Sequence, residues 1–134
     1  MCDWFTFHVD QDAKMVVIVI DAQTLFENQP ETYDEADQVC TEVIIPIVDT
    51  LRTTCVEKGY QQTCTVDLKD VDVTLMSPSI LSRMIWNIYD QNKEEPENLI
   101  KEFSVFNSNT LFRGIYKVAR KLLPKYMRDS ITVY

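Results

Sequence analysis

Four aspartates are the side chains of this sequence best suited to acid–base or metal chemistry. Asp21 follows an apolar run, and Asp67, Asp70 and Asp72 follow a second segment of strand-like composition. The cleft outside the strand ends is where open α/β sheets bind ligands. However, no glycine-rich phosphate loop, Walker lysine or His/Cys pair accompanies these acids. We therefore interpret them as solvated loop carboxylates, because aspartate is rarely buried unless it is paired.

The four cysteines and the single histidine do not suggest a catalytic or zinc-binding set. Cys2, Cys40, Cys55 and Cys64 lack the close pairs that zinc sites use. We expect them to be buried, reduced thiols. His8 occupies a strand-like position, and a lone histidine cannot build a metal cluster. The sequence thus predicts no metal, no cofactor, no catalytic residue and no enzyme.

Charge is divided unevenly along the chain. Residues 1–97 carry 6 basic and 19 acidic side chains, a net charge of −13, whereas residues 98–134 carry 7 basic and 2 acidic ones, a net charge of +5. Segregation of this size indicates where a partner docks and says little about the fold. We predict no nucleic-acid partner.

Length and composition predict one soluble globular domain spanning residues 1–134. The chain has 134 residues, near the commonest domain size, and 46% of them are hydrophobic. Its longest apolar run, Met15 to Ile20, is too short to span a bilayer and has no signal-peptide pattern around it. We expect a cytosolic protein.

The N-terminal third predicts a hairpin followed by a long helix. Trp4–Val9 and Met15–Ile20 have strand composition, and the continuous β-branched residues of the second predict a central strand covered on both faces by helices. A polar, acidic loop is predicted from Asp21 to Glu31. Apolar spacing predicts one helix over 33–58, kinked near Ile45 because Pro46 removes an amide donor.

The rest of the chain predicts alternating strands and helices. The predicted elements are a strand over 60–68, a helix from Ser77-Pro78 to just before Glu94, a strand over 103–106, a basic helix over 110–123 that Pro124 ends, and a strand over 131–134. Together with the hairpin, this order predicts an α/β layer fold with a mixed, mostly parallel sheet flanked by helices.

The basic helix is amphipathic. Its predicted apolar face comprises Leu111, Phe112, Ile115, Val118, Ala119 and Leu122. The predicted basic surface comprises Arg113, Lys117, Arg120 and Lys121. By periodicity alone this pattern also fits an ordinary surface helix packed on the sheet.

An ordered set of short motifs resembles the CRAL-TRIO lipid-binding domain, a superfamily that includes secretory phosphatidylinositol-transfer proteins. The set comprises Glu57-Lys58-Gly59-Tyr60, Thr63 to Val71, Ser77-Pro78-Ser79, Pro96 to Leu99, Asn107, and Leu111 to Tyr116. The resemblance covers nearly the whole chain, but two parts of full lipid-transfer members are missing, an N-terminal helical tripod and a C-terminal segment.

The resemblance implies a sheet that floors an apolar pocket, with residues 110–123 as the gate helix over a bound phospholipid or other small hydrophobic ligand. One side of this helix would contact acyl chains and the other anionic headgroups, which predicts lipid transfer or lipid sensing at the membrane periphery. In phosphatidylinositol-binding members the position of Glu97 contacts the headgroup. The lysine that partners it there is replaced by Ser130, which argues against inositol-lipid specificity.

Two alternatives remain open at this stage. Divergent BCH-type members of the superfamily bind regulators of small GTPases or self-associate, and the strand over 131–134 would offer an edge for a homodimer. Separately, Val19 to Gln23 and Thr54-Cys55-Val56 are similar to segments of isochorismatase-like cysteine hydrolases. That similarity requires Cys55 at the start of a helix, whereas periodicity predicts it near the end of one.

Overall fold

The computed structural model describes residues 3–92 and 100–134. Its elements, in chain order, are β1 (Phe5–Asp10), β2 (Met15–Ile20), α1 (Ala22–Asn28), α2 (Tyr33–Val39), a π-helical turn (Cys40–Ile44), α3 (Ile45–Lys58), β3 (Gln61–Asp67), a 3₁₀ turn (Val73–Leu75), α4 (Pro78–Asn92), β4 (Glu102–Phe106), α5 (Thr110–Ala119), a second 3₁₀ turn (Arg120–Leu122), α6 (Lys125–Ser130) and β5 (Ile131–Val133).

The five strands form one sheet in the order β1-β2-β3-β4-β5. β1 is antiparallel to β2, and each later strand is parallel to the one before it. The prediction of a mixed, mostly parallel α/β sheet is therefore confirmed. Because the strand order never reverses, right-handed crossovers place successive helices on the same side of the sheet.

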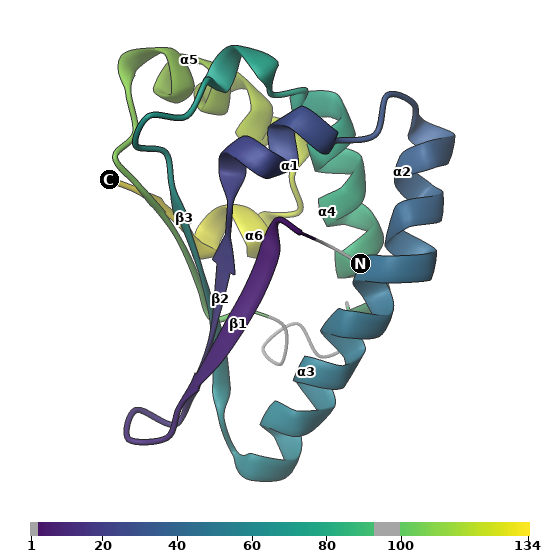
Figure 1. Cartoon of the computed structure of the whole chain (residues 1–134), viewed down its shortest axis with the longest axis vertical. Coiled ribbons are helices and arrows are strands. Elements are labelled where there is room, and N and C mark those ends of the chain that lie inside the picture. The colour runs from purple at the N-terminus through teal and green to yellow at the C-terminus, as the bar shows by residue number, and fades with distance from the viewer. Residues whose placement is uncertain (1–2, 93–99) are drawn as a thin grey trace.

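α2, α3, α4 and α6 lie on one side of the sheet, which we call the inner face, and α1 and α5 lie near its upper end (Figure 1). Val16 and Ile18 of β2 point to this face and are 1% and 3% exposed, whereas Val19 on the outer face is 39% exposed. The prediction that helices cover β2 on both faces is wrong for the described residues. An apolar run of six residues indicates a buried strand. It does not reveal whether helices cover both faces of that strand or only the face to which every second side chain points.

The segment from Asp21 to Glu31, predicted as a loop, begins with a helix. The carboxylate of Asp21 caps α1 by accepting a hydrogen bond from the Thr24 amide at 3.1 Å. Phe26 of α1 is buried against the sheet side of the core. A cap and one apolar anchor thus stabilise a short helix whose polar composition alone favoured a loop.

The long helix predicted over 33–58 is present but interrupted. α2 continues through the π-helical turn, in which the Ile45 amide donates to the Cys40 carbonyl, and α3 follows with Pro46 in its first turn. The break near Ile45 is confirmed, and its cause is the amide donor that proline lacks. α3 ends at Gly59, whose φ of 68° is in the left-handed region.

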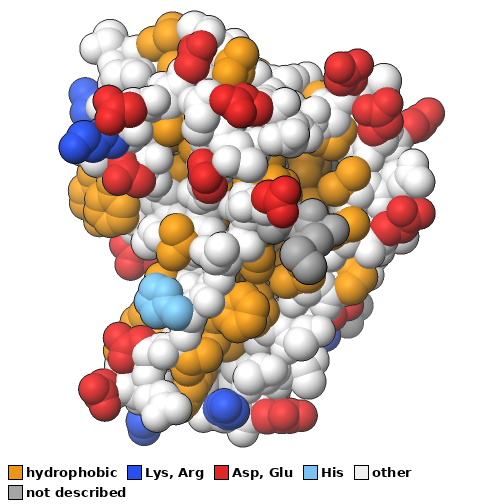
Figure 2. Space-filling model, in the orientation of Figure 1, with side chains coloured by type: hydrophobic (Ala, Val, Ile, Leu, Met, Phe, Trp, Pro, Cys, Tyr) orange, Lys and Arg blue, Asp and Glu red, His pale blue; other side chains and the backbone are white. Residues whose placement is uncertain are grey.

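Figure 2 shows that acidic side chains dominate the face of the molecule formed by β1 and α1–α3. Two hydrophobic side chains of β1, Phe7 and Val9, are also exposed, at 51% and 43%. The basic helix α5 lies on another part of the surface, above the carboxyl ends of the strands (Figure 1). The charge division of the sequence therefore becomes a division of the surface.

Candidate functional site

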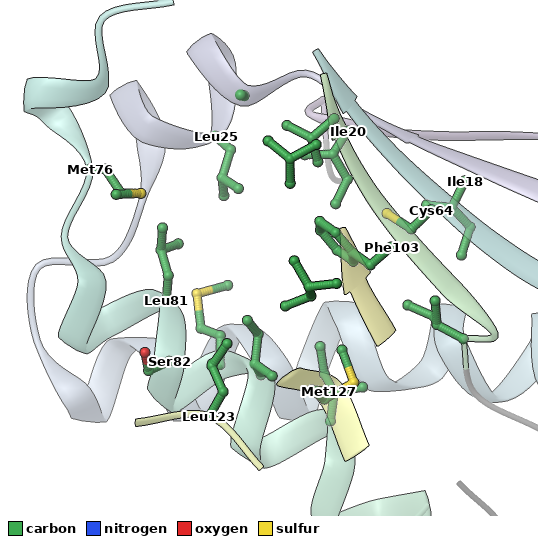
Figure 3. A pocket seen from close by; sticks show the side chains of 18 of the residues that line it. Ile18, Ile20, Leu25, Cys64, Met76, Leu81, Ser82, Phe103, Leu123 and Met127 are labelled. Carbon is green, nitrogen blue, oxygen red and sulfur yellow. The ribbon is translucent and has the colours of Figure 1, made fainter. Parts of the chain in front are cut away.

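An apolar cavity of about 240 Å³ lies between the inner face of the sheet and the helices that cover it. Ile18, Cys64 and Phe103 reach into it from three neighbouring strands (Figure 3). Leu81 of α4 and Leu123 close it from the helix side. Side chains alternate between the two faces of a sheet, so every second side chain of β2, β3 and β4 points to the inner face. These side chains form the floor of the cavity.

The cavity wall is electrostatically neutral. No residue that lines it within the described part of the chain carries a formal charge, and its polar side chains include Gln62 and Ser82, which are 4% and 7% exposed. Burial raises the pKa of the Cys64 thiol to about 12. Burial also raises the pKa of the Tyr116 hydroxyl, although Arg120 and Arg128 oppose the shift. Both shifts indicate surroundings that disfavour charge.

α5 forms one wall of this cavity. Asn109 caps the helix by accepting a hydrogen bond from the Phe112 amide at 2.8 Å. The rings of Phe112 and Tyr116 are stacked with their centroids 5.9 Å apart. Phe112, Tyr116, Ala119 and Leu123 all line the cavity, at the spacing expected for one stripe of a helix.

The structure divides the six side chains that were predicted to share the lipid-facing side of this helix. Phe112 and Ala119 line the cavity, whereas Ile115 is half-buried and outside its lining. Leu111, Val118 and Leu122 face solvent and are 50%, 68% and 51% exposed. Their predicted place on the inner side of the helix is corrected by these exposures.

The apolar arc of α5 is wider than the face it buries, which explains this division. Positions 111, 115, 118 and 122 form one stripe, and positions 112, 116, 119 and 123 form the adjacent one. Periodicity cannot tell which of two neighbouring stripes is inward. Tyr116 and Leu123 were missed for this reason, although their spacing of four residues from Phe112 and from Ala119 was visible in the sequence.

The outward stripe of α5 and the basic side chains beside it form what we call the docking face. Arg113, Lys117, Arg120 and Lys121 are all exposed, and none of them forms an ion pair within residues 3–92 and 100–134. Trp86 of α4, 39% exposed, donates a hydrogen bond from its ring nitrogen to the Leu122 carbonyl. The docking face therefore combines exposed apolar side chains, an indole and four cations.

Of the two predicted headgroup positions, the structure describes only Ser130. Glu97 lies outside the described residues. The Ser130 hydroxyl donates to the Tyr126 carbonyl at 2.8 Å, within α6. The described residues therefore provide no cation for an ionised headgroup at these positions.

The aspartates lie in turns and caps. Asp67 accepts hydrogen bonds from the Asn107 side chain at 2.8 Å and the Lys69 amide at 2.9 Å, and these bonds lower its pKa. Asp72 accepts from the Thr74 amide at 3.0 Å. Within the described residues, no three His, Cys, Asp or Glu side chains are grouped so that they could hold a metal ion.

The geometry does not fit the cysteine-hydrolase similarity. Cys55 is 3% exposed near the end of α3, and the Tyr60 amide bonds to its carbonyl at 2.9 Å, beside the start of β3. Asp21 follows the end of β2, which runs parallel to β3. Cys55 packs in a buried cluster with Val16 and Ile18, whereas the Asp21 carboxylate lies beyond the end of β2, where it caps α1. Burial also raises the pKa of the Cys55 thiol, opposite to what a nucleophile requires.

Among solved structures, the crystal structure of Sfh5, a Sec14 homologue with the CRAL-TRIO fold, superposes on this chain with a TM-score of 0.60. The two chains are 17% identical, and the match covers 98% of this chain. This chain has a CRAL-TRIO-like fold. The resemblance inferred from the ordered motifs is therefore confirmed at the level of the fold.

The CRAL-TRIO-like fold is supported by structure rather than by sequence similarity. No protein-family model matches the sequence, and no curated protein matches it either. The match spans 46% of the Sfh5 chain, so this chain corresponds to about half of that structure.

Proposed function

We propose that this protein binds a hydrophobic lipid in the cavity beneath α5 and docks on anionic membranes through the docking face, acting in lipid transfer or lipid sensing. The single observation that carries the proposal is the apolar, uncharged cavity of about 240 Å³. The CRAL-TRIO-like fold also suggests lipid binding. We infer a binding protein, not an enzyme.

The cavity gives a hydrocarbon ligand a clear free-energy gain. Side chains that line an empty apolar space lose dispersion contacts that a ligand restores. Each methylene group that moves from water into such a site contributes about 0.8 kcal/mol. Part of this gain offsets the freedom that the ligand loses on binding.

The docking face suits an anionic lipid surface. Each Lys or Arg near such a surface contributes about 1 kcal/mol, within a Debye length of about 8–10 Å. Exposed Val118 and Leu122 can enter the region between headgroups and acyl chains, where Trp86 would also be favoured. The acidic face in Figure 2 would point away from the membrane.

The protein would attach peripherally. None of the helices formed by the described residues has the length and apolar character needed to cross a bilayer. Cys40, Cys55 and Cys64 are buried and form no disulfide within the described residues, as expected from the sequence, whereas Cys2 lies outside those residues. Buried, reduced thiols are typical of a reducing compartment. We therefore propose the cytoplasmic side of a membrane as the place of action.

A cavity-filling substitution tests lipid binding directly. Val66 lines the cavity on β3, and its neighbour Thr65 points to the outer face. Val66→Phe should weaken the binding of a fluorescent apolar probe at least tenfold, because the new ring occupies the ligand's space. Thr65→Phe adds a ring to the same strand outside the cavity and should bind the probe as the wild type does.

Circular dichroism and urea titration establish that both variants are folded. The proposal is wrong if the folded wild-type protein does not bind apolar probes at all. It is equally wrong if Val66→Phe and Thr65→Phe, both folded, bind the probe equally well.

A protein-interaction module is the second candidate function, and the exposed stripe of α5 is the observation that favours it. A stripe with Val118 at 68% exposure could pack against an acidic protein as well as a membrane. β5 is also an edge strand of the sheet, so self-association by strand pairing is possible in principle. A dimer that persists on dilution in light scattering, together with indifference to anionic vesicles, would favour this function.

A further inference from the structure

We propose that the cavity selects an uncharged ligand with one hydrocarbon body of roughly ten buried carbon atoms, and excludes ionised lipids and intact diacyl phospholipids; the inference rests on the proposed lipid-binding function. It follows from the volume of the cavity, the chemistry of its wall and the position of the nearest cations. Each of these is a property of this chain's own residues.

The volume sets the size of the ligand. An apolar cavity of about 150 Å³ accommodates benzene with its six carbon atoms. By the same measure, the cavity of about 240 Å³ accommodates roughly ten carbon atoms. A diacyl phospholipid is several times larger, so the wall formed by α4 and α5 would have to move away from the sheet to admit it. A monoterpenoid or a medium-chain alcohol fits without this movement.

The wall sets the charge of the ligand. Burial of an ionised carboxylate or phosphate without a partner is strongly unfavourable. The cavity lining within the described residues has no charged side chain. The cations of α5 are exposed, whereas Phe112 and Tyr116 on the same helix form the cavity wall. An anionic group inside the cavity would therefore have no paired positive charge from residues 3–92 and 100–134.

One buried polar side chain in the wall allows one polar group on the ligand. Ser82 is on α4, at the wall opposite the sheet, where Figure 3 shows its hydroxyl at the edge of the cavity. A serine hydroxyl both donates and accepts. A ligand with one hydroxyl or carbonyl group can hydrogen-bond at this wall, whereas a ligand with several polar groups cannot satisfy them all.

The charge of the ligand is tested with two probes of equal length. The wild-type protein is loaded with naphthalene, a fluorescent apolar probe of the proposed ligand size, and 1-decanol and decanoate are compared as competitors at pH 7.4. We expect 1-decanol to displace the probe at a free concentration at least tenfold lower, which corresponds to about 1.4 kcal/mol. Equal displacement by decanoate would overturn the exclusion of charge.

The size of the ligand is tested with phosphatidylcholine vesicles. We expect these vesicles neither to displace the probe from the cavity nor to donate a phospholipid to the protein that is recovered after their removal. Phospholipid in the recovered protein would overturn the size limit and leave the proposed lipid-binding function standing. Failure of the apolar probe itself to bind would contradict the proposed function instead, so the two failures are distinguishable.

The role of Ser82 is tested by a matched pair of substitutions in α4. Ser82→Ala should weaken the binding of 1-decanol several-fold, because the ligand hydroxyl loses its partner. Ser79→Ala changes an exposed serine one turn earlier and should leave the affinity for 1-decanol unchanged. If both variants bind 1-decanol with equal affinity, Ser82 does not hydrogen-bond to the ligand and this part of the proposal is wrong.

Discussion

At the scale of single residues, neighbouring apolar side chains of α5 have different surroundings. Phe112 is 8% exposed and lines the cavity, whereas Leu111, the preceding residue, is 50% exposed. The sequence predicted that both would be apolar helix positions with one common role. Only the packing of α5 against the sheet separates them, because a difference of one residue rotates a side chain by about 100°.

This separation predicts unequal costs of truncation. Phe112→Ala should lower the free energy of unfolding by about 3–5 kcal/mol, the usual cost of removing a buried aromatic side chain. Leu111→Ala should change it by no more than about 0.5 kcal/mol, as for other exposed positions. Urea titration of the two variants measures the difference, and similar values for both would contradict the assigned orientation of α5.

At the scale of elements, α2 and α4 are joined by a polar cluster on the surface. The Arg83 guanidinium donates two hydrogen bonds to the Asp37 carboxylate, both at 2.9 Å, and the Asn87 side chain donates a third at 2.7 Å. These bonds, the one from Arg83 first, lower the pKa of Asp37 to about 2. α4 carries Leu81 and Ser82 of the cavity wall, so this cluster helps to position that wall.

The cluster predicts a pH-dependent contribution to stability. The pKa of Asp37 is lower in the folded than in the unfolded chain, so its contribution is present above the usual carboxyl value of about 3.9 and is lost as pH falls towards about 2. Asp37→Asn should therefore be less stable than the wild type at pH 6, and the two should converge as pH falls through this window. A constant difference between pH 6 and pH 2.5 in urea titrations would contradict this account.

Local sequence signals predicted some elements better than others. The strand over Met15–Ile20 and the helix start at Pro78 are each confirmed, because one residue type dominates the local conformation. α1 and α6 were not predicted. Both are short, at 7 and 6 residues, and each is stabilised mainly by a single buried anchor, Phe26 or Met127, whose partners are distant in the sequence.

At the scale of the whole molecule, strand order determines where the cavity lies. Because the sheet runs β1 to β5 without reversal, its helices gather on one face, and the cavity forms between them and the floor. The motif resemblance predicted a cavity beneath residues 110–123, and the structure contains one there. The size and neutrality of that cavity could not be predicted, since they depend on how side chains from six or more elements pack together.

The division of charge over the surface predicts salt-sensitive membrane binding. Vesicles that contain phosphatidylserine should sediment more of the protein than pure phosphatidylcholine vesicles, and the difference should shrink as salt rises from 0.1 M to 1 M and the Debye length falls from about 10 to 3 Å. Lys117→Glu combined with Lys121→Glu should abolish the difference. Lys14→Glu combined with Lys58→Glu changes the net charge by the same amount at exposed positions away from α5, and it is the matched control.

Unchanged sedimentation of the doubly substituted protein would contradict the role assigned to the docking face. Loss of binding in the control with Lys14→Glu and Lys58→Glu as well would also contradict it, because the effect would then follow net charge rather than the position of the cations.

Occupancy of the cavity is the central claim, and mass spectrometry of the purified protein tests it most directly. The native mass of the wild-type chain should include one bound hydrophobic molecule, which organic extraction releases and identifies. Val66→Phe, purified in the same way, should have the mass of the chain alone. A wild-type protein that carries no extractable molecule and takes up none from a lipid mixture would contradict the claim.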